Sequence, residues 1–385
     1  MKLSIIRGYK VILLIMRLRL TIIKIALQVS NNPATALTVL KRLIRKRKQI
    51  HGGARISKFV QSGSRYFWVT DFPGFPSEAF DGCMRNEILR TKNPGSETTS
   101  LQTVVWGITN RCPLRCKHCY EWDHLDFSDR LSLANLKIIL NKIRAHNIHH
   151  IQLSGGEPLA RCNDMIALIK AGGTGIDFWL LTSGFGLTTE KAVALKNAGL
   201  TGVQISLDHW DEHFHNEFRA NDLSFQWVRD AVASCKKAGI IVSLSLCATK
   251  EFVSNENLWR YMDLAKEWGV HFVRLLEPRN TGRFANTNSE LNAEEISILG
   301  NFYSMYGAAT KNSDHPILTY PGHHQRKMGC FGAGNRYLYI DSNGGFHACP
   351  FCLQEHGNAL ETSFDDAVRK LKERKCHAFE MNTTD

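Results

Sequence analysis

The sequence predicts an α/β protein built around a partial (β/α)6 barrel of the TIM type. Six apolar, strand-like runs alternate with helical patterns in the middle of the chain, which favours a parallel sheet. A strongly basic segment precedes these runs, and a second group of cysteines follows them. We therefore expect four parts: a basic amphipathic helical arm (1–50), a hairpin, helix and linker (51–100), the barrel (101–280), and a small cysteine-rich α+β extension (281–385).

Composition indicates a globular protein with reduced thiols. At 385 residues the chain can bury a large core, and its 43% hydrophobic and 22% charged residues are ordinary for a soluble domain. Its eleven cysteines are clustered in a long chain with no clear signal peptide, which disfavours a secreted disulfide scaffold. Thiols that hold metal in a reducing compartment fit better, so we expect a cytoplasmic protein.

The net charge of +12 comes entirely from the arm. Residues 1–50 contain twelve Lys and Arg and no Asp or Glu, whereas the rest of the chain has 36 basic and 36 acidic residues. A neutral body gives no support for a nucleic-acid-binding core, so we expect no nucleic-acid partner.

The arm reads as two helices separated by Ser30-Asn31-Asn32-Pro33, which combines a cap and a breaker. In the first helix, polar residues recur at steps of three, four or seven and share one narrow face: Arg7, Lys10, Arg17, Thr21, Lys24 and Gln28. The longest fully apolar run, Val11 to Met16, is too short to span a bilayer. Three interpretations stay open: packing on the protein's own body, contact with an anionic membrane surface, and binding of a protein or peptide partner.

The segment before the barrel predicts a hairpin and a helix. Arg55–Val60 and Arg65–Thr70 read as its two strands, joined by a turn that contains Gly63. A helix is expected near Glu78–Arg90, and the polar linker Thr91–Ser100 follows it.

The barrel is predicted from six strand-and-helix units. The strands are expected at Val104–Thr109, His150–Leu153, Phe178–Thr182, Gly202–Leu207, Ile240–Cys247 and Val270–Leu275. The helices between them are expected near Leu133–Ala145, Asp164–Ala171, Glu190–Ala198, Phe225–Ala238 and Asn257–Trp268. Gly199, Gly239 and Gly269 follow three of these helices, as C-terminal caps tend to. In such barrels the reactive groups gather in loops at the carboxyl ends of the strands.

Three cysteines lie within eight residues directly after the first strand, in Cys112-Pro-Leu-Arg-Cys116-Lys-His-Cys119. Thiolates this close can bind one metal centre together. No fourth cysteine follows until Cys162, so a four-iron cluster held here would keep one iron without a protein ligand. An open iron suggests chemistry rather than electron storage alone.

The loop after the second strand reads Ser154-Gly155-Gly156-Glu157-Pro158. Its paired glycines let the backbone approach a ligand closely, and Glu157 adds a carboxylate beside them. Together with the cysteine loop one βα unit earlier, this motif makes the region from Val104 to Pro278 resemble the radical S-adenosylmethionine (SAM) superfamily.

That resemblance implies a 4Fe–4S cluster ligated by Cys112, Cys116 and Cys119, with the amine and carboxylate of SAM on the open iron. It further implies that an electron from the cluster cleaves SAM, and that the 5′-deoxyadenosyl radical then takes a hydrogen atom from the substrate. By position it assigns SAM-binding roles to His118 (adenine), Gly155, Gly156 and Glu157 (methionyl amine), Ser206 (ribose or carboxylate) and Arg219 (carboxylate). Ser183 is included because it stands where relatives usually carry an asparagine.

A few other residues carry weaker signals. Glu277 ends the sixth strand and could reach substrate, although one acidic residue there is more often structural. His209, His213 and His215 crowd the segment after the fourth strand, where solvated loop histidines are a better explanation than a metal site. Cysteines that stand singly are expected to be small buried hydrophobes, namely Cys83, Cys235 and Cys247.

The second cysteine group consists of Cys330, Cys349, Cys352 and Cys376. A hairpin with the turn Asp341-Ser-Asn-Gly-Gly345 separates the first of them from the Cys349-Pro-Phe-Cys352 pair. This stretch resembles the SPASM or twitch extension of radical SAM peptide-modifying enzymes. Four cysteines imply one auxiliary iron–sulfur cluster at most, with Cys376 as its fourth ligand or with substrate or water in that place; a structural zinc knuckle is the alternative.

Three functions follow from these motifs. The first is a radical SAM enzyme that modifies a peptide or protein, as the second cysteine group implies. The second is a radical SAM enzyme that acts on a small molecule, and the third is a non-catalytic iron–sulfur or zinc protein. Either enzyme needs a reductant such as flavodoxin or ferredoxin. For the arm, peripheral contact with a membrane is one of the three interpretations that stay open.

Overall fold

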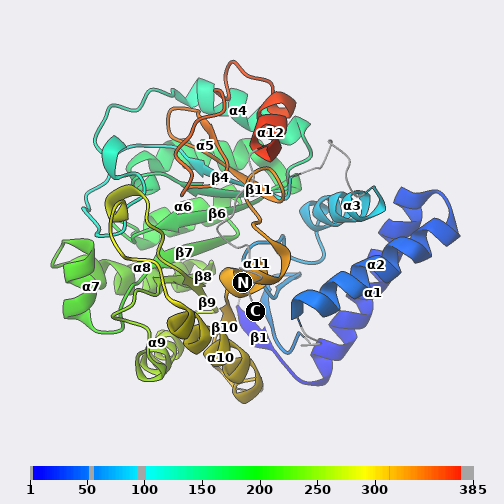
Figure 1. Ribbon diagram of the computed structural model, residues 1–385, viewed down its shortest axis with the longest axis horizontal. Helices are drawn as coiled ribbons and strands as arrows, with labels where there is room; N and C mark the ends of the chain where they lie inside the picture. Colours follow the sequence, from blue (N-terminus) through cyan, green and yellow to red (C-terminus); the bar gives the residue numbers. More distant parts are fainter. Residues whose placement is uncertain (1–2, 52–55, 94–100, 312, 374–385) are drawn as a thin grey trace.

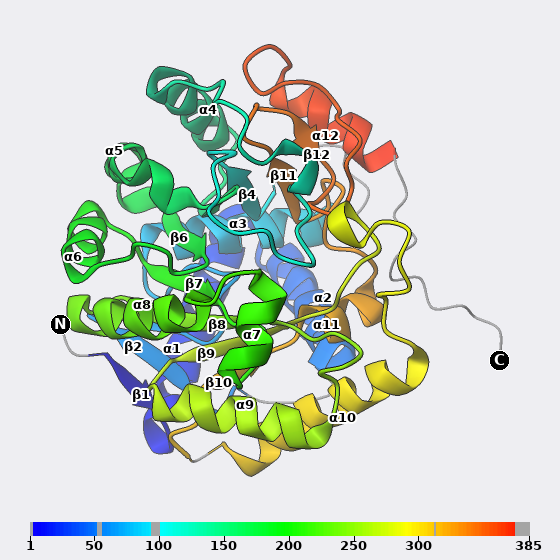
Figure 2. The ribbon, with the colours of Figure 1, turned by 90° about the vertical axis from the view of Figure 1, so that its left-hand side faces the viewer.

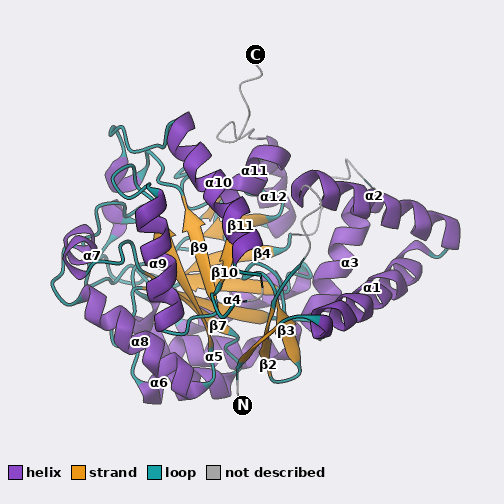
Figure 3. Cartoon of the chain, turned by 90° about the horizontal axis from the view of Figure 1, so that it is seen from below, coloured by secondary structure: helices purple, strands orange, loops and turns teal. Residues whose placement is uncertain are grey.

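A nine-stranded sheet forms the centre of the protein (Figures 1 and 3). The computed structural model describes residues 3–51, 56–93, 101–311 and 313–373. The strands lie in the order β10-β9-β8-β7-β6-β5-β4-β11-β12, and every neighbouring pair is parallel except β11 and β12. Because β4 to β9 lie side by side in chain order, each connection moves one strand along the sheet, as in a barrel that is not closed.

The six middle strands coincide with the predicted ones. They are β4 (Thr103–Gly107), β5 (His150–Ser154), β6 (Asp177–Thr182), β7 (Gly202–Ser206), β8 (Ile241–Cys247) and β9 (Phe272–Leu276). Two short strands extend the sheet at its edges, β10 (Ile317–Thr319) beside β9 and β11 (Tyr337–Ile340) beside β4. β12 (Phe346–His347) pairs with β11.

Helices form an arc around the outside of these strands (Figure 2). Five of them are the predicted ones: α4 (Leu133–Ala145), α5 (Cys162–Gly172), α6 (Thr189–Ala198), α8 (Ser224–Ala238) and α9 (Asn255–Glu267). Helix α4 shows why they form, since Leu136, Ile139, Leu140 and Ile143 share one face and are buried. Each such side chain contributes about 1.5–3 kcal/mol when it leaves water. Gly199 and Gly239 end α6 and α8 in the left-handed conformation, as predicted.

One helix differs from the prediction. Residues expected as a histidine-rich loop after the fourth strand form α7 (Glu212–Arg219), whose N-terminus is capped by the Asp211 carboxylate. Its buried residues are His215 and Arg219, not apolar side chains. Hydrophobic periodicity therefore could not reveal this helix. Four short 3₁₀ turns complete the barrel region: Trp122–His124, Pro158–Arg161, Gly173–Gly175 and Gly282–Phe284.

The N-terminal hairpin covers the amino ends of the barrel strands. β1 (Ser4–Ile6), which was not predicted, pairs with β2 (Phe59–Ser62), and β2 pairs with β3 (Arg65–Phe67). Asp177, the first residue of β6, pairs with Arg65 and accepts the Gly74 N–H at 2.9 Å. This end of the barrel is therefore closed by protein, and the opposite, carboxyl end carries the cysteine loop.

The arm forms a helical hairpin at one flank of the protein (Figure 1). α1 (Tyr9–Ser30) and α2 (Pro33–His51) are separated where the sequence predicts a break, and both pack on α3 (Glu78–Lys92). Their shared core contains Ile25, Val39 and Ile88. No helix among the described residues is long and apolar enough to cross a membrane.

The C-terminal region lies against the barrel. It contains α10 (Ala293–Ala309), α11 (Pro321–Met328) and α12 (Phe364–Glu373) besides the three short strands. β11 runs parallel to β4, with Tyr337 opposite Thr103 and Ile340 opposite Trp106. Cys330 precedes β11, and Cys349 and Cys352 follow the antiparallel β12. The pairing of β11 with β4 places this segment beside the strand that leads into the cysteine loop.

Candidate active site

The cysteine loop begins at the carboxyl end of β4 and is fixed by backbone contacts. Asp129 accepts hydrogen bonds from Thr109 Oγ1 at 2.8 Å and from the Asn110 N–H at 3.0 Å. Inside the loop, the Cys119 N–H donates to the Cys116 carbonyl at 3.3 Å. Cys116 is buried, and Cys112 and Cys119 are half-buried. These hydrogen bonds fix the backbone of the loop at both Asn110 and Cys119.

The three thiols suit a cluster better than a single ion. Burial raises the pKa of Cys112 and of Cys119 to about 12, and the neighbouring thiols contribute to both shifts, so the three lie within one electrostatic environment. A set of thiols alone is also the set that iron–sulfur clusters use.

The loop after β5 packs directly on the cysteine loop. The N–H groups of Gly156 and Glu157 donate to the carbonyls of Thr109 and Arg111 at 2.8 and 2.7 Å. A Cβ on Gly155 or Gly156 would lie 2.5 Å from the same two carbonyl oxygens, and Gly155 also has a φ of 129°. Only glycine allows this approach. The two motifs recognised in the sequence therefore form one structural unit.

Glu157 holds the loops after β5 and β6 together. Its buried carboxylate accepts hydrogen bonds from Thr182 Oγ1 at 2.7 Å, from the Ser183 N–H at 2.8 Å and from Ser183 Oγ at 2.5 Å. The Leu159 N–H donates a further bond at 3.1 Å. Burial raises the pKa of Glu157, and these hydrogen bonds oppose that shift. Ser183 thus lies in the site, although its partner is a protein carboxylate.

Arg219 is buried, not on the surface. Its Nε and Nη2 both lie 2.6 Å from Asp208 Oδ2, and its Nη1 lies 3.5 Å from Cys116 Sγ. Burial alone would raise the pKa of Asp208, but Arg219 and the nearby histidines hold it below its ordinary value. The sequence motif Ser206-Leu-Asp208 contained Asp208, but no role was predicted for it. Ser206 itself lies half-buried at the end of β7.

His118 lies among aromatic rings. It stacks on Phe218 at a centroid distance of 4.8 Å, and Phe284 lies 6.5 Å away. Burial lowers the pKa of His118 to about 4, so the ring is neutral at physiological pH. Its Nδ1 is buried without a hydrogen-bond partner in the described chain. Phe218 and Phe284 were not predicted, because both are far from His118 in sequence.

The C-terminal region contacts the cysteine loop through aromatic side chains. Tyr120 packs edge-on against Tyr339 of β11 at 5.9 Å and against Phe351 at 6.1 Å. Tyr339 also donates a hydrogen bond to Glu121, and Ser342 donates one to Asn110. The loop is therefore held between the barrel and the C-terminal hairpin.

A second segment covers the other side of the loop. The Arg283 N–H donates to the Cys119 carbonyl at 2.9 Å, and its guanidinium lies 4.5 Å from the Trp122 ring centroid. Gly282 has a φ of 56°, and a Cβ there would lie 2.3 Å from the Cys119 carbonyl oxygen. This close approach requires glycine.

Glu277 has structural partners. Its carboxylate accepts hydrogen bonds from Tyr320 Oη at 2.6 Å and from Arg326 Nη1 and Nη2 at 2.8 and 2.5 Å. It thereby fixes α11 to the end of β9. These contacts fit a structural role for Glu277.

Three cysteines of the second group come together. A Cβ on Gly332 would lie 3.3 Å from Cys349 Cβ and 3.5 Å from Cys330 Sγ, and the Cys349 and Cys352 thiols form a hydrogen bond. That bond and burial raise the pKa of Cys349. Cys376 lies outside the described residues. The single cysteines Cys83, Cys235 and Cys247 are buried, as expected.

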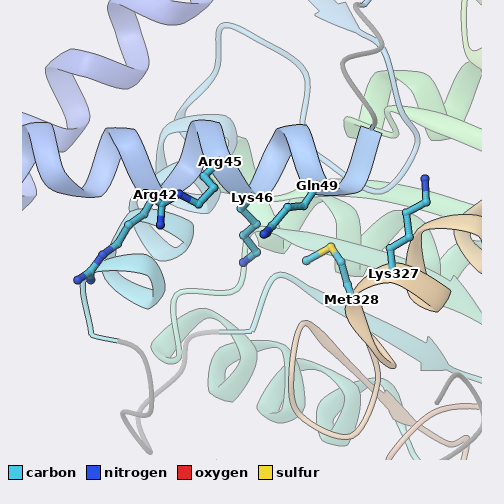
Figure 4. Close-up of a pocket in the computed structure, with 6 residues that line it drawn as sticks. All are labelled: Arg42, Arg45, Lys46, Gln49, Lys327 and Met328. Atoms are coloured by element: carbon cyan, nitrogen blue, oxygen red, sulfur yellow. The ribbon is translucent and has the colours of Figure 1, made fainter. Parts of the chain in front are cut away.

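A basic cleft of about 590 Å³ lies between α2 and α11 (Figure 4). Arg42, Arg45, Lys46, Gln49, Lys327 and Met328 line it. Lys46 also pairs with Glu87 at 3.1 Å. None of these residues belongs to the cysteine loop or to the loop after β5, so the cleft is separate from the candidate active site.

Comparisons with known proteins agree with this geometry. Residues 106–265 match the Radical SAM superfamily. The chain is 26% identical to an AdoMet-dependent heme synthase of Oleidesulfovibrio alaskensis, over 77% of this chain and 82% of that protein. It is 26% identical to the mycofactocin maturase MftC of Mycobacterium tuberculosis, over 67% of each chain. The crystal structure of Streptococcus suis SuiB with its precursor peptide SuiA has the same fold, with a TM-score of 0.60, 15% identity, and coverage of 89% of this chain and 80% of that one.

Proposed function

This chain carries a radical SAM domain over residues 106–265, and we propose that it uses SAM to modify a peptide or protein substrate. Cys112, Cys116 and Cys119 would hold a 4Fe–4S cluster, and SAM would bind beside it. When bound, this pair supplies reductive cleavage of SAM and abstraction of a hydrogen atom from the substrate. The protein's own residues bind, orient and enclose the reactants.

Each predicted SAM-binding residue has a task that its position supports. Gly155 and Gly156 bring the loop backbone up to the cysteine loop, and Glu157 keeps that backbone in place through Thr182 and Ser183. The carbonyl groups of this loop would accept hydrogen bonds from the methionyl amine, since four protein donors already occupy the Glu157 carboxylate.

The remaining contacts concern the methionyl carboxylate, the ribose and the adenine of SAM. Arg219 would attract the methionyl carboxylate while Asp208 holds its guanidinium in place. The unpartnered Nδ1 of His118 would form a hydrogen bond beside the adenine, and Phe218 would support the imidazole ring by stacking on it. Ser206, at the end of β7, would reach the ribose or the carboxylate.

The observation that carries the peptide proposal is an aromatic contact between the segments that carry the two cysteine groups. β11 pairs with β4, and Tyr339 and Phe351 reach Tyr120 beside Cys119. A second metal centre at Cys330, Cys349 and Cys352 would therefore lie next to the reaction site. We propose an auxiliary iron–sulfur cluster there, with Cys376 as a further ligand. The similarity to the mycofactocin maturase MftC over 67% of each chain supports this choice.

A small-molecule substrate is the second candidate. The heme synthase of O. alaskensis matches a larger share of this chain than the maturase does. A precursor of heme is therefore the small molecule to test first.

We also propose that the enzyme works in the cytoplasm with a flavodoxin or ferredoxin as reductant. The basic arm would bring it to a membrane surface, because residues 1–50 contain twelve cationic side chains and no acidic ones.

One experiment separates peptide from small-molecule substrates. Extract from the native host is divided by ultrafiltration, and each fraction is added to reconstituted, reduced enzyme with SAM. We expect the macromolecular fraction to increase 5′-deoxyadenosine formation and protease treatment to remove the increase. Stimulation by the small-molecule fraction alone would contradict the peptide proposal. Cys116→Ala, without the cluster, gives the background.

A further inference from the structure

Helix α1 exposes an apolar stripe that no part of the described chain covers. It consists of Tyr9, Leu13, Met16, Leu20, Ile23 and Leu27, whose exposures range from 41% to 70%. The steps between them alternate between four and three residues, which keeps them on one face along almost the whole helix. We call these six residues the α1 stripe.

The stripe lies opposite the face that α1 buries. Val11, Leu18 and Ile25 are buried against the protein, and at 100° per residue they point about 180° away from Tyr9, Met16 and Ile23. The burial of α1 on the body and the exposure of the stripe are therefore independent features of the helix. A surface helix that only packs on its own protein needs one apolar face.

Cationic residues border the stripe. Lys10, Arg17 and Lys24 each follow a stripe residue by one position and form a row along one side, and Arg19 lies on the other side. All four are exposed. An apolar strip with cations on both sides is the pattern of helices that lie in the interface of an anionic bilayer.

The same charges disfavour a second copy as the occupant. When two helices pair through such a stripe, the residues that border it face each other across the interface. Residues 1–50 contain no acidic residue, so pairing two α1 helices would bring cations together, with Asp81 of α3 as a carboxylate beside Lys24 alone. A bilayer with anionic headgroups supplies both the apolar interior and the opposite charge.

We propose that the α1 stripe lies flat in the surface of an anionic membrane. The stripe enters the boundary between headgroups and acyl chains, and the bordering cations contact lipid phosphates. The helix does not span the bilayer, because its cations are spread along its length and no described helix has the character of a span. This inference names the face and the lipid class behind the proposed membrane contact.

Vesicle flotation of the full chain tests the proposal. Vesicles of phosphatidylcholine alone are compared with an equimolar mixture of phosphatidylcholine and phosphatidylglycerol. We expect binding to the anionic vesicles that weakens as salt is added, and little binding to the neutral ones. Leu13→Ser with Leu20→Ser should lower the partition coefficient by at least about tenfold. Lys10→Gln with Arg19→Gln should weaken binding to the anionic vesicles only.

The control is Ile138→Ser, which removes a comparably exposed apolar side chain from α4 and should change nothing. Thermal unfolding should be the same for all variants, since the side chains are exposed. Formation of 5′-deoxyadenosine should also persist in the stripe variant, so failure of this inference is distinguishable from failure of the proposed reaction. Equal binding to both vesicle types, or unchanged binding of the stripe variant, would overturn the proposal. So would lipid-free self-association that the stripe variant abolishes.

Discussion

Arg219 and Asp208 form a buried ion pair at the carboxyl end of the sheet, with two guanidinium nitrogens 2.6 Å from one carboxylate oxygen. The pair joins the end of β7 to the end of α7, and its third nitrogen reaches Cys116. The Lys117 N–H also donates to the carbonyl of Phe218, the residue before Arg219. Helix α7 thus contacts the cysteine loop at two points, Cys116 and Lys117. The ion pair sets the position of the helix and of the loop.

Asp208→Asn should destabilise the protein and weaken SAM binding. It would leave the Arg219 charge buried without its partner, which costs about 3–5 kcal/mol. Denaturant unfolding and the apparent affinity for SAM measure the two effects. The matched control is Lys117→Gln, which breaks an exposed pair with Glu217 and should leave the stability nearly unchanged. Equal effects of the two substitutions would refute the role given to the buried pair.

Acid should destabilise the protein through His215. Burial lowers the pKa of His215 from 6.5 to about 3. The negative charge of Asp208 opposes this shift, and the positive charges of Arg219, His209 and His118 add to it. Its Nδ1 accepts the Asp208 N–H at 3.1 Å. The unfolded state binds a proton that the folded state does not, so this stability is complete above pH 6.5 and is lost as pH falls toward 3.

The loss should reach about 1.4 kcal/mol per pH unit within that window. His215→Gln, which keeps an acceptor for the Asp208 N–H, should reduce the slope of unfolding free energy against pH by up to one proton. An unchanged slope would mean that His215 is already protonated in the folded protein. Intrinsic tryptophan fluorescence follows the unfolding at each pH.

Gly156→Ala should disrupt SAM binding. The new Cβ would lie 2.5 Å from the Arg111 carbonyl oxygen, so the loop must move away from the cysteine loop. We expect the Michaelis constant for SAM to rise at least about tenfold, because misplacement of binding groups by a fraction of an ångström is costly. Iron content should stay near wild type.

Gly307→Ala is the control for this substitution. Gly307 lies in α10, where a Cβ meets nothing within 4 Å, so alanine should leave SAM binding unchanged and stabilise the helix by about 0.5–1 kcal/mol. Similar behaviour of the two alanine variants would argue against the packing of the two loops.

Cys330→Ala with Cys349→Ala tests the second metal centre. If these thiols hold an auxiliary cluster, the variant should lose about half of the iron of reconstituted protein and keep the cluster of the first loop. Iron and zinc are measured together by elemental analysis. Cys162→Ala serves as the control, because Cys162 only begins α5. Unchanged iron accompanied by loss of zinc would favour a zinc knuckle instead.

Much of the barrel was predictable from local sequence. β4 to β9 are short apolar runs, and the helices between them have apolar faces, polar caps and terminal glycines. Helix α7 escaped prediction because its buried face is made of His215 and Arg219, which pattern recognition treats as solvent-exposed. β1 has only three residues, and its partner strand lies more than fifty residues away.

Within the site, contiguous motifs were predictable and long-range partners were not. Residue spacing alone identifies two motifs in the sequence, the cysteines Cys112, Cys116 and Cys119 and the Gly155–Glu157 loop. The pairing of Tyr120 with Tyr339 depends on β11 joining β4, which no local pattern specifies. The hydrogen bonds that Ser183 donates to Glu157 likewise depend on where the neighbouring strands β5 and β6 end.

The most direct test of this account is the formation of 5′-deoxyadenosine. Enzyme reconstituted without oxygen, with the first cluster fully loaded, is given a strong reductant and SAM, and the product is measured by mass spectrometry. We expect 5′-deoxyadenosine in the wild type and none in Cys112→Ala, Cys116→Ala or Cys119→Ala. Absence of the product from fully loaded wild-type enzyme, with substrate-containing extract present, would contradict the central claim.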